Sequence, residues 1–152
     1  MLDITIIAVG KIKNSAQAGL AAEYLKRLKP YARLKLVELS ATPFTQAQKE
    51  KSLAAEGKKI SEYLAGRTGA QIFLMAERGK LMTSPELAGW LDKHSPLILV
   101  IGGALGFSQE IYDKYPALSL SPLTFPHEMA RVILLEQIYR AATILNKKDY
   151  HY

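Results

Sequence analysis

The strongest constraint on the fold is Pro96–Ile101 (PLILVI), a run of six residues without a polar side chain. A strand with this composition is typical of a sheet that is covered on both faces. Asp3–Val9 and Ala70–Ala76 are also mostly apolar and predict two more buried strands. Arg33–Leu39 alternates charged and apolar residues, as a half-exposed strand does, and Ala117–Leu120 predicts a short fifth strand.

Helix signals occupy the segments between these strands. Asn14 or Ser15 can cap a helix that ends near Lys29, and about 20 residues of helix follow the loop that ends at Thr45. A capping-box pattern begins at Thr83, and Ser108 caps a further short helix. Strands and helices therefore alternate about five times, which predicts an α/β fold with a mostly parallel sheet and helices on both faces. No repeat or linker marks a boundary, so we expect one domain over residues 1–152.

The last predicted helix is apolar over an unusually wide arc. Pro126 suits its first turn, and apolar residues recur at the spacing of one helical face from Met129 to Ala142. Further apolar residues, such as Leu134 and Leu145, widen this stripe beyond the arc that one sheet would cover. We expect one side of the helix to pack on its own sheet and the other against a second copy of the chain.

Composition excludes several classes of protein and site. The chain has no cysteine, which excludes disulfides, thiolate metal sites and a cysteine nucleophile. Its three histidines, His94, His127 and His151, are not at metal-binding spacing, so we expect no metal. No apolar run has transmembrane length and the first residues show no signal-peptide pattern, so we expect a cytoplasmic protein.

The positive charge is unevenly distributed along the chain. Of a net charge of +6, residues 1–66 contribute 11 Lys and Arg against 6 Asp and Glu, whereas residues 67–152 contribute 9 against 8. This asymmetry suggests that one basic face meets a polyanion. Lysines that serve only the solubility of surface helices would give the same counts.

Three loops are predicted to follow the third, fourth and fifth strands: Ala76–Lys80, Gly102–Phe107 and Leu120–Phe125. Ligands of parallel α/β sheets bind beyond the carboxyl ends of the strands, so these loops are candidates for a site. The glycines of Gly102–Gly106 either let backbone amides approach a ligand or serve a tight turn between strand and helix. Their order matches neither a dinucleotide fingerprint nor a P-loop.

Several single residues have two interpretations each. His127 is either a packing group at the start of a helix or part of a site. Glu136 and Arg140 have the spacing of a helix ion pair. Arg131, on an apolar helix, either forms a buried pair or binds an RNA phosphate or a cofactor carboxylate. The tail Lys147–Tyr152 is either docked on the protein or available to stack on a base and contact phosphate.

Taken together, several motifs resemble one family nearly end to end, the SPOUT-class ribosomal large subunit methyltransferase H enzymes. These enzymes methylate N3 of a pseudouridine in 23S rRNA of the assembled 70S ribosome. The motifs are Leu99–Gly106, Leu118–Ser121 with Thr124–His127, and Ala130–Ala141, together with Ile6–Lys11, Glu23-Tyr24, Gly79-Lys80 and Tyr150-His151.

The resemblance implies S-adenosylmethionine as the cofactor, a C-terminal trefoil knot, and a homodimer formed through the knot helix. A knot is a feature that general folding rules would not predict. Met75 stands where the family commonly has leucine, and Ala104-Leu105 where it commonly has Pro-Glu, so the acidic side chain of that loop is absent here. The implied cofactor contacts are Met75, Gly102, Gly103, Leu120, Ser121, Pro122, Leu123, Thr124 and Phe125.

For catalysis, we expect His151 to act as a base at N3 of the target, supplied either by the same chain or across the dimer. Arg140 and Tyr150 would position the target nucleotide, and His127 would shape the pocket. Three other functions stay open: a ribosome-binding protein without catalysis, a SPOUT enzyme acting on a different RNA base, and a nucleotide-binding α/β enzyme that does not act on RNA.

Overall fold

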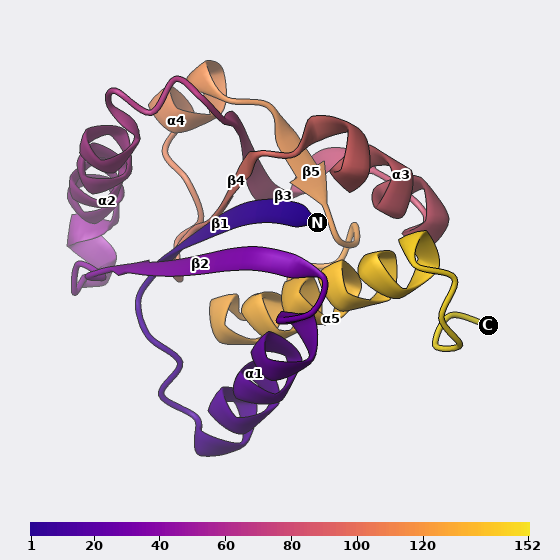
Figure 1. Ribbon diagram of the computed structural model, residues 1–152. Helices are drawn as coiled ribbons and strands as arrows, with labels where there is room; N and C mark the ends of the chain where they lie inside the picture. The colour runs from indigo at the N-terminus through magenta and orange to yellow at the C-terminus, as the bar shows by residue number, and fades with distance from the viewer.

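The computed structural model describes residues 1–152 and consists of one five-stranded sheet with helices on both faces (Figure 1). The strand order is β2-β1-β4-β3-β5, and every adjacent pair is parallel. All five residues of β4 are buried at the centre of the sheet, as their apolar run predicts. The strands are β1 (Leu2–Val9), β2 (Ala32–Leu39), β3 (Gln71–Leu81), β4 (Leu97–Ile101) and β5 (Ala117–Ser119).

Three of the five helices begin at the predicted caps, whereas the helices that begin at Lys49 and His127 have no side-chain cap. The Asn14 side chain accepts a hydrogen bond from the Gln17 backbone at the start of the first helix, and the Thr83 capping box is present in full. The Ser108 hydroxyl accepts from the backbone in the same way. None of the helices is both long enough and apolar enough to span a membrane. The helices are α1 (Ser15–Leu28), α2 (Lys49–Leu64, preceded by a 3-10 turn at Gln46–Gln48), α3 (Ser84–His94), α4 (Gln109–Lys114) and α5 (His127–Leu145).

The sheet separates two hydrophobic cores. Side chains of β1 and β4 alternate between them, so that Ile6 and Leu99 face the core under α1, α3 and α5. Ile7 and Val100 face the core under α2 and α4. The predicted α/β class, with a parallel sheet and helices on both faces, is therefore confirmed.

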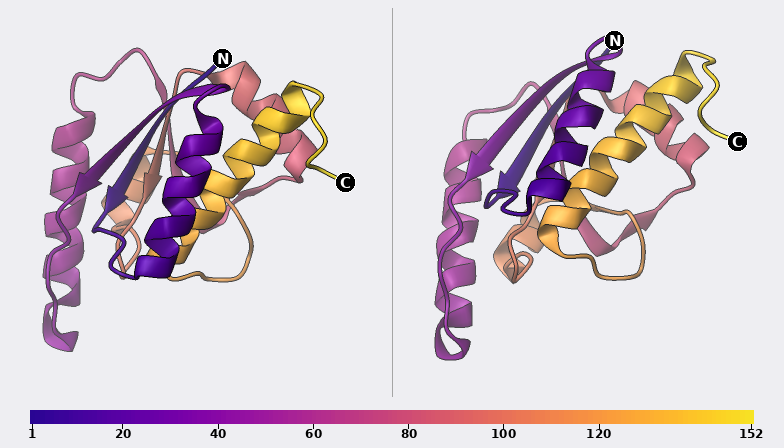
Figure 2. Two further views of the ribbon diagram at one scale, coloured as in Figure 1. Left: turned by 60° about the horizontal axis from the view of Figure 1, so that its bottom comes forward. Right: turned by 90° about the horizontal axis from the view of Figure 1, so that it is seen from below.

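Helix α5 lies between α1 and α3 on one face of the sheet (Figure 2). Tyr139 packs against Tyr24 of α1, and the Ser84 hydroxyl of α3 donates to the Gln137 side chain at 2.8 Å. The two neighbouring helices explain most of the wide apolar stripe, so the width alone does not require a second copy of the chain. Met129, near the start of α5, remains exposed.

The prediction of a loop over Ala76–Lys80 is wrong, because β3 continues through this segment to Leu81. Leu118 of β5 pairs first with Met75 and then with Lys80, so the intervening residues form a bulge. A Cβ atom at Gly79 would lie 2.6 Å from backbone atoms of β5. Only glycine therefore allows β3 to pass this close to β5. This pairing is long-range in sequence and leaves no local signal.

Many of the basic residues of the first half of the chain lie on α1 and α2, and these helices cover opposite faces of the sheet (Figure 2). Between them is β2, the edge strand, with exposed Arg33 and Lys35. The expected basic face would therefore lie around the β2 edge of the sheet, and its contact with a polyanion stays a prediction.

Candidate functional site

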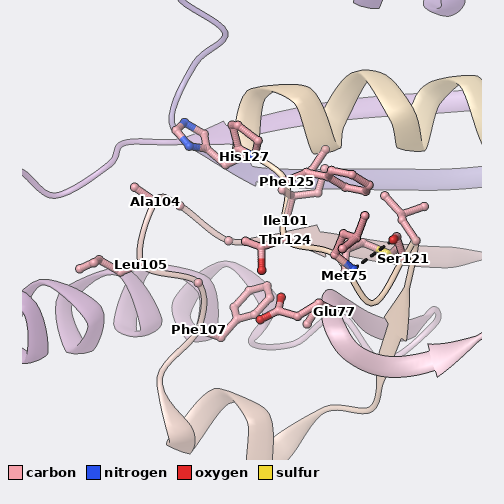
Figure 3. A pocket seen from close by; sticks show the side chains of 18 of the residues that line it. Met75, Glu77, Ile101, Ala104, Leu105, Phe107, Ser121, Thr124, Phe125 and His127 are labelled. Carbon is pink, nitrogen blue, oxygen red and sulfur yellow. Dashed lines mark hydrogen bonds between the residues drawn. The ribbon is translucent and has the colours of Figure 1, made fainter.

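A cavity of about 710 Å³ opens beyond the carboxyl ends of β4 and β5 and beside the part of β3 where its bulge begins (Figure 3). Its walls are residues of these strands, the two loops Gly102–Phe107 and Leu120–Pro126, and the start of α5. This is the position at which parallel α/β sheets bind ligands, and the volume lies within the range of small-molecule and cofactor sites.

The glycine loop after β4 is a tight turn. The Gly106 N–H donates to the Gly103 carbonyl at 3.0 Å, and Gly106 has φ +74°. A Cβ at Gly102 would lie 2.9 Å from the Gly106 carbonyl oxygen, and one at Gly103 would lie 2.9 Å from a Glu56 carboxylate oxygen. The interpretation as a tight turn is confirmed. Because the same loop also forms a wall of the cavity, the tight turn is itself part of the candidate site.

Hydrogen bonds of two serine hydroxyls fix the conformation of the second loop. The Ser119 hydroxyl donates to the Ser121 carbonyl at 2.8 Å and accepts from the Ser121 N–H at 3.2 Å. The Ser121 hydroxyl accepts from the Leu123 N–H at 3.0 Å. The predicted cofactor contacts that line the cavity are Met75, Gly102, Gly103, Leu120, Ser121, Leu123, Thr124 and Phe125. Pro122 belongs to the same loop but is not among the lining residues.

His127 is the first residue of α5 and lines the cavity. Gly10, whose φ of +92° favours glycine, follows β1 beside the imidazole, and a Cβ there would lie 3.6 Å from His127 Nε2, an ordinary contact. The neighbouring Glu128 carboxylate accepts from the backbone N–H groups of Lys13 and Asn14. The Lys13 hydrogen bond is the main cause of a lowered pKa of Glu128. These contacts fix the start of α5 beside the cavity.

Arg131 forms a buried ion pair. Its side chain is 2% exposed, and its guanidinium donates to Glu38 at 2.6 Å and to the Gly10 carbonyl at 2.8 Å. It does not line the cavity. The interpretation as a buried pair is confirmed, and Arg131 joins α5 to the ends of β1 and β2.

The other predicted catalytic residues lie elsewhere in the chain. Arg140 follows His127 by 13 positions on α5, which corresponds to about 20 Å along the helix. Tyr150 and His151 lie beside Arg140, beyond the end of α5. Within one chain, the structure therefore brings the cofactor residues and His127 together, and separately groups Arg140, Tyr150 and His151.

The Glu136 carboxylate organises this second group, as the predicted helix pair suggests. It accepts from Arg140 at 2.5 Å and from the Tyr150 hydroxyl at 3.1 Å. The Tyr150 hydroxyl lies 3.4 Å from that of Tyr24, and its ring packs edge-on against Tyr139 at 4.8 Å. Burial raises the pKa of Tyr150, and the contacts with Tyr24 and Glu136 raise it further.

The tail is therefore docked on the protein. His151 lies beyond the anchored Tyr150, with its Nδ1 3.4 Å from an Arg140 nitrogen, and it is exposed. Tyr152 is fully exposed. The docked interpretation of the tail is confirmed, and its last two side chains remain available to a partner.

Sequence reasoning missed two parts of these groups. Tyr24 appeared only as part of a resemblance, because nothing local connects α1 to the C-terminus 126 positions later. Glu77 lines the cavity but lies in the segment mistaken for a loop. No local pattern identifies it, because β3 continues past it to Leu81 through pairing with β5.

Comparisons with known proteins define the class of this fold and site. Residues 2–151 match the family described as "Predicted SPOUT methyltransferase". A probable methylase family protein from Haemophilus influenzae aligns with the whole chain and 72% of its own length, at TM-score 0.63 and 17% identity. TrmJ from Z. mobilis aligns with 93% of this chain and 70% of its own, at TM-score 0.53 and 13% identity. The two solved structures show the shared fold.

Closer relatives identify the family within this class. Ribosomal RNA large subunit methyltransferase H of Gloeobacter violaceus is 40% identical over 152 residues, which cover 98% of each chain. The protein of the same name from Pelotomaculum thermopropionicum is 40% identical over 164 residues, with full coverage of both chains. The chain belongs to this family of SPOUT methyltransferases, which confirms the resemblance of its motifs.

Proposed function

We propose that this chain uses S-adenosylmethionine to methylate N3 of a pseudouridine in 23S rRNA of the assembled 70S ribosome, working in the cytoplasm as a single domain over residues 1–152. The observation that carries the proposal is the cavity beyond the ends of β4 and β5, because eight of the nine cofactor residues implied by the family motifs line it. Full-length identity of about 40% to ribosomal RNA large subunit methyltransferase H supports rRNA as the substrate.

The cavity suits the cofactor in size and chemistry. Most of its lining residues are hydrophobic, among them Met75 and Phe125, which suits an adenine ring and the aliphatic carbons of the cofactor. Gly102, Gly103 and Gly106 line the cavity without side chains, so their backbone can approach a ligand closely. When bound, the cofactor supplies a methyl group that is already activated on a sulfonium. The residues of the chain then have to orient the target and exclude water.

The C-terminal group is proposed to handle the target base. N3 of the uracil ring carries a proton that must leave before N3 can accept a methyl group, and we propose that the exposed imidazole of His151 takes it. Arg140 and Tyr150 position the nucleotide, and His127 shapes the cavity wall. Because Tyr150 is held by Glu136, the tail is ordered before RNA binds.

The separation of the two groups supports a shared site in a homodimer. About 20 Å of helix separates His127 from Arg140, so His151 does not meet the cavity of its own chain. A two-fold dimer with antiparallel α5 helices would place the tail of one chain at the cavity of its partner. Exposed Met129 on α5 and Leu20 on α1 supply apolar surface for such an interface. The trefoil knot implied by the family motifs stays a prediction.

The basic edge around β2 is proposed to contact rRNA phosphates. Arg33 and Lys35 are exposed there, between the lysine-bearing helices α1 and α2. Binding to ribosomes should therefore weaken steeply as salt concentration rises.

A transfer assay tests the function. Purified protein is incubated with radiolabelled S-adenosylmethionine and ribosomes from cells that lack the gene, as assembled 70S particles and as free large subunits. The label is then mapped by nuclease digestion and mass spectrometry. The proposal predicts label at one pseudouridine of 23S rRNA, strongest on 70S particles. Label at another base would mean that the chain is a SPOUT methyltransferase with a different target. Binding to ribosomes without binding of the cofactor would contradict methyl transfer.

A further inference from the structure

The cavity contains a single unbalanced charge. Glu77 is the one carboxylate among its lining residues, and no lysine or arginine lines it. The glycine loop contributes only the apolar side chains of Ala104, Leu105 and Phe107. The Glu77 carboxylate has no ion-pair partner within 4.0 Å. Figure 3 shows its side chain directed toward the cavity from the bulged part of β3. The cavity therefore has a local negative charge that nothing in the protein neutralises by contact.

The fold holds Glu77 in this position. The bulge between Met75 and Lys80 takes this part of β3 out of register with β5, and the obligatory glycine at Gly79 closes the bulge. The neighbouring Arg78 does not pair with Glu77, because its guanidinium lies over the Tyr112 ring, 3.1 Å from the ring centroid. Glu77 is exposed and its carboxylate is solvated, so its charge is available to a cationic ligand bound in the cavity that it lines.

Methyl transfer changes the charge of the cofactor. The bond between sulfur and the methyl carbon breaks, both of its electrons stay on sulfur, and a bond from N3 to the methyl carbon forms as the N3 proton leaves. S-adenosylmethionine has a net charge of +1, from a sulfonium, an ammonium and a carboxylate, whereas the product S-adenosylhomocysteine has a net charge of zero. A carboxylate in the cavity therefore attracts the substrate form more strongly than the product form.

We propose that Glu77 is the residue that selects the charged cofactor over its neutral product. It strengthens binding of S-adenosylmethionine and loses its attraction once the methyl group has left, which favours product release. This inference rests on the proposed use of S-adenosylmethionine and adds a residue that the family motifs do not include. At a partly solvated site, removing the charge should lower the affinity for the cationic ligand by about 5- to 10-fold.

The test compares three ligands on the dimeric protein and its Glu77→Gln variant by isothermal titration calorimetry. The ligands are S-adenosylmethionine, the cationic amine analogue sinefungin, and S-adenosylhomocysteine. The substitution should lower the affinity for the two cationic ligands by about 5- to 10-fold and the affinity for the neutral product by less than about 2-fold. Added salt should reduce the preference of the parent protein for the cations and leave the variant unaffected.

Glu110→Gln is the matched control, since it removes the same charge from an α4 side chain that pairs with Lys114 outside the cavity lining. It should change none of the three affinities. If Glu77→Gln weakens binding of all three ligands equally, or changes none of the affinities, Glu77 does not select the charged cofactor. If the parent protein binds none of the ligands, the proposed cofactor itself is wrong, which is a different result from an unchanged preference.

Discussion

The docked tail offers a perturbation whose size follows from its contacts. Tyr150→Phe keeps the ring that packs against Tyr139 at 4.8 Å but removes the hydroxyl that meets Glu136 at 3.1 Å and Tyr24 at 3.4 Å. A hydrogen bond to a charged group contributes about 1.5–3 kcal/mol and a neutral one about 0.5–1.5 kcal/mol. Because Tyr150 is only partly buried, we expect a loss of about 1–2 kcal/mol in the free energy that holds the tail in place.

Limited trypsin digestion measures this loss. Cleavage after Lys147 or Lys148 requires the tail to leave its docked position, since the Lys148 N–H is bonded to the Thr143 carbonyl at 2.9 Å. When opening is fast relative to cleavage, the cleavage rate follows the population of the open tail. A loss of 1–2 kcal/mol should therefore accelerate cleavage by roughly 5- to 30-fold, while the global unfolding midpoint stays unchanged.

Tyr152→Phe is the control, because Tyr152 is fully exposed. Its cleavage rate should equal that of the parent protein. Tyr24→Phe, which removes only the longer of the two contacts of the Tyr150 hydroxyl, should give an intermediate acceleration. If Tyr150→Phe is cleaved no faster than the Tyr152→Phe control, the hydroxyl contacts do not hold the tail and its proposed preordering is wrong.

Three further outcomes follow from the structure. Glu38→Gln leaves the buried cation of Arg131 without its partner and should lower the free energy of unfolding by about 1–3 kcal/mol in urea; an unchanged midpoint would mean that the pair contributes nothing. Gly103→Ala places a methyl group against a carboxylate of α2 and should weaken cofactor binding by more than about 10-fold in calorimetry, whereas Gly69→Ala, with open space around it, should have no effect. The raised pKa of Tyr150 means that the unfolded tail ionises first, so tail docking should be fully present below pH 10 and weaken above it; ultraviolet titration should then show one late tyrosine that Tyr150→Phe removes.

Local patterns in the sequence predict most of the fold. The apolar run at Leu97–Ile101 predicts a strand buried on both faces, and all five residues are buried. The caps at Asn14, Thr83 and Ser108 act through side-chain hydrogen bonds within three residues, so a short stretch of sequence is enough to find them. Pairing between strands is different. The extension of β3 beyond Ala76 depends on β5, about 40 positions later, and its own residues have little strand character.

Periodicity predicts which residues are buried but not what covers them. The wide apolar stripe of α5 is explained largely by α1 and α3, a result that no pattern within α5 contains. The lysines of α1 and α2 reach opposite faces of the sheet because successive crossovers differ in the side they take. For the candidate site, family motifs locate the cavity residues well, whereas the contact of Tyr24 with Tyr150 depends on the packing of α1 beside α5.

Complementation between two impaired variants distinguishes a shared site from a self-contained one. Gly103→Ala alters the cavity and His151→Ala removes the tail imidazole, and the two chains can be coexpressed with different tags and purified as mixed dimers. If the tail of each chain serves its partner's cavity, a mixed dimer has one intact site and should transfer methyl groups to 70S ribosomes at about half the rate of the parent dimer. If the tail serves its own cavity, both sites of the mixed dimer are impaired. Activity no higher than that of the two separate variants would therefore contradict the shared site.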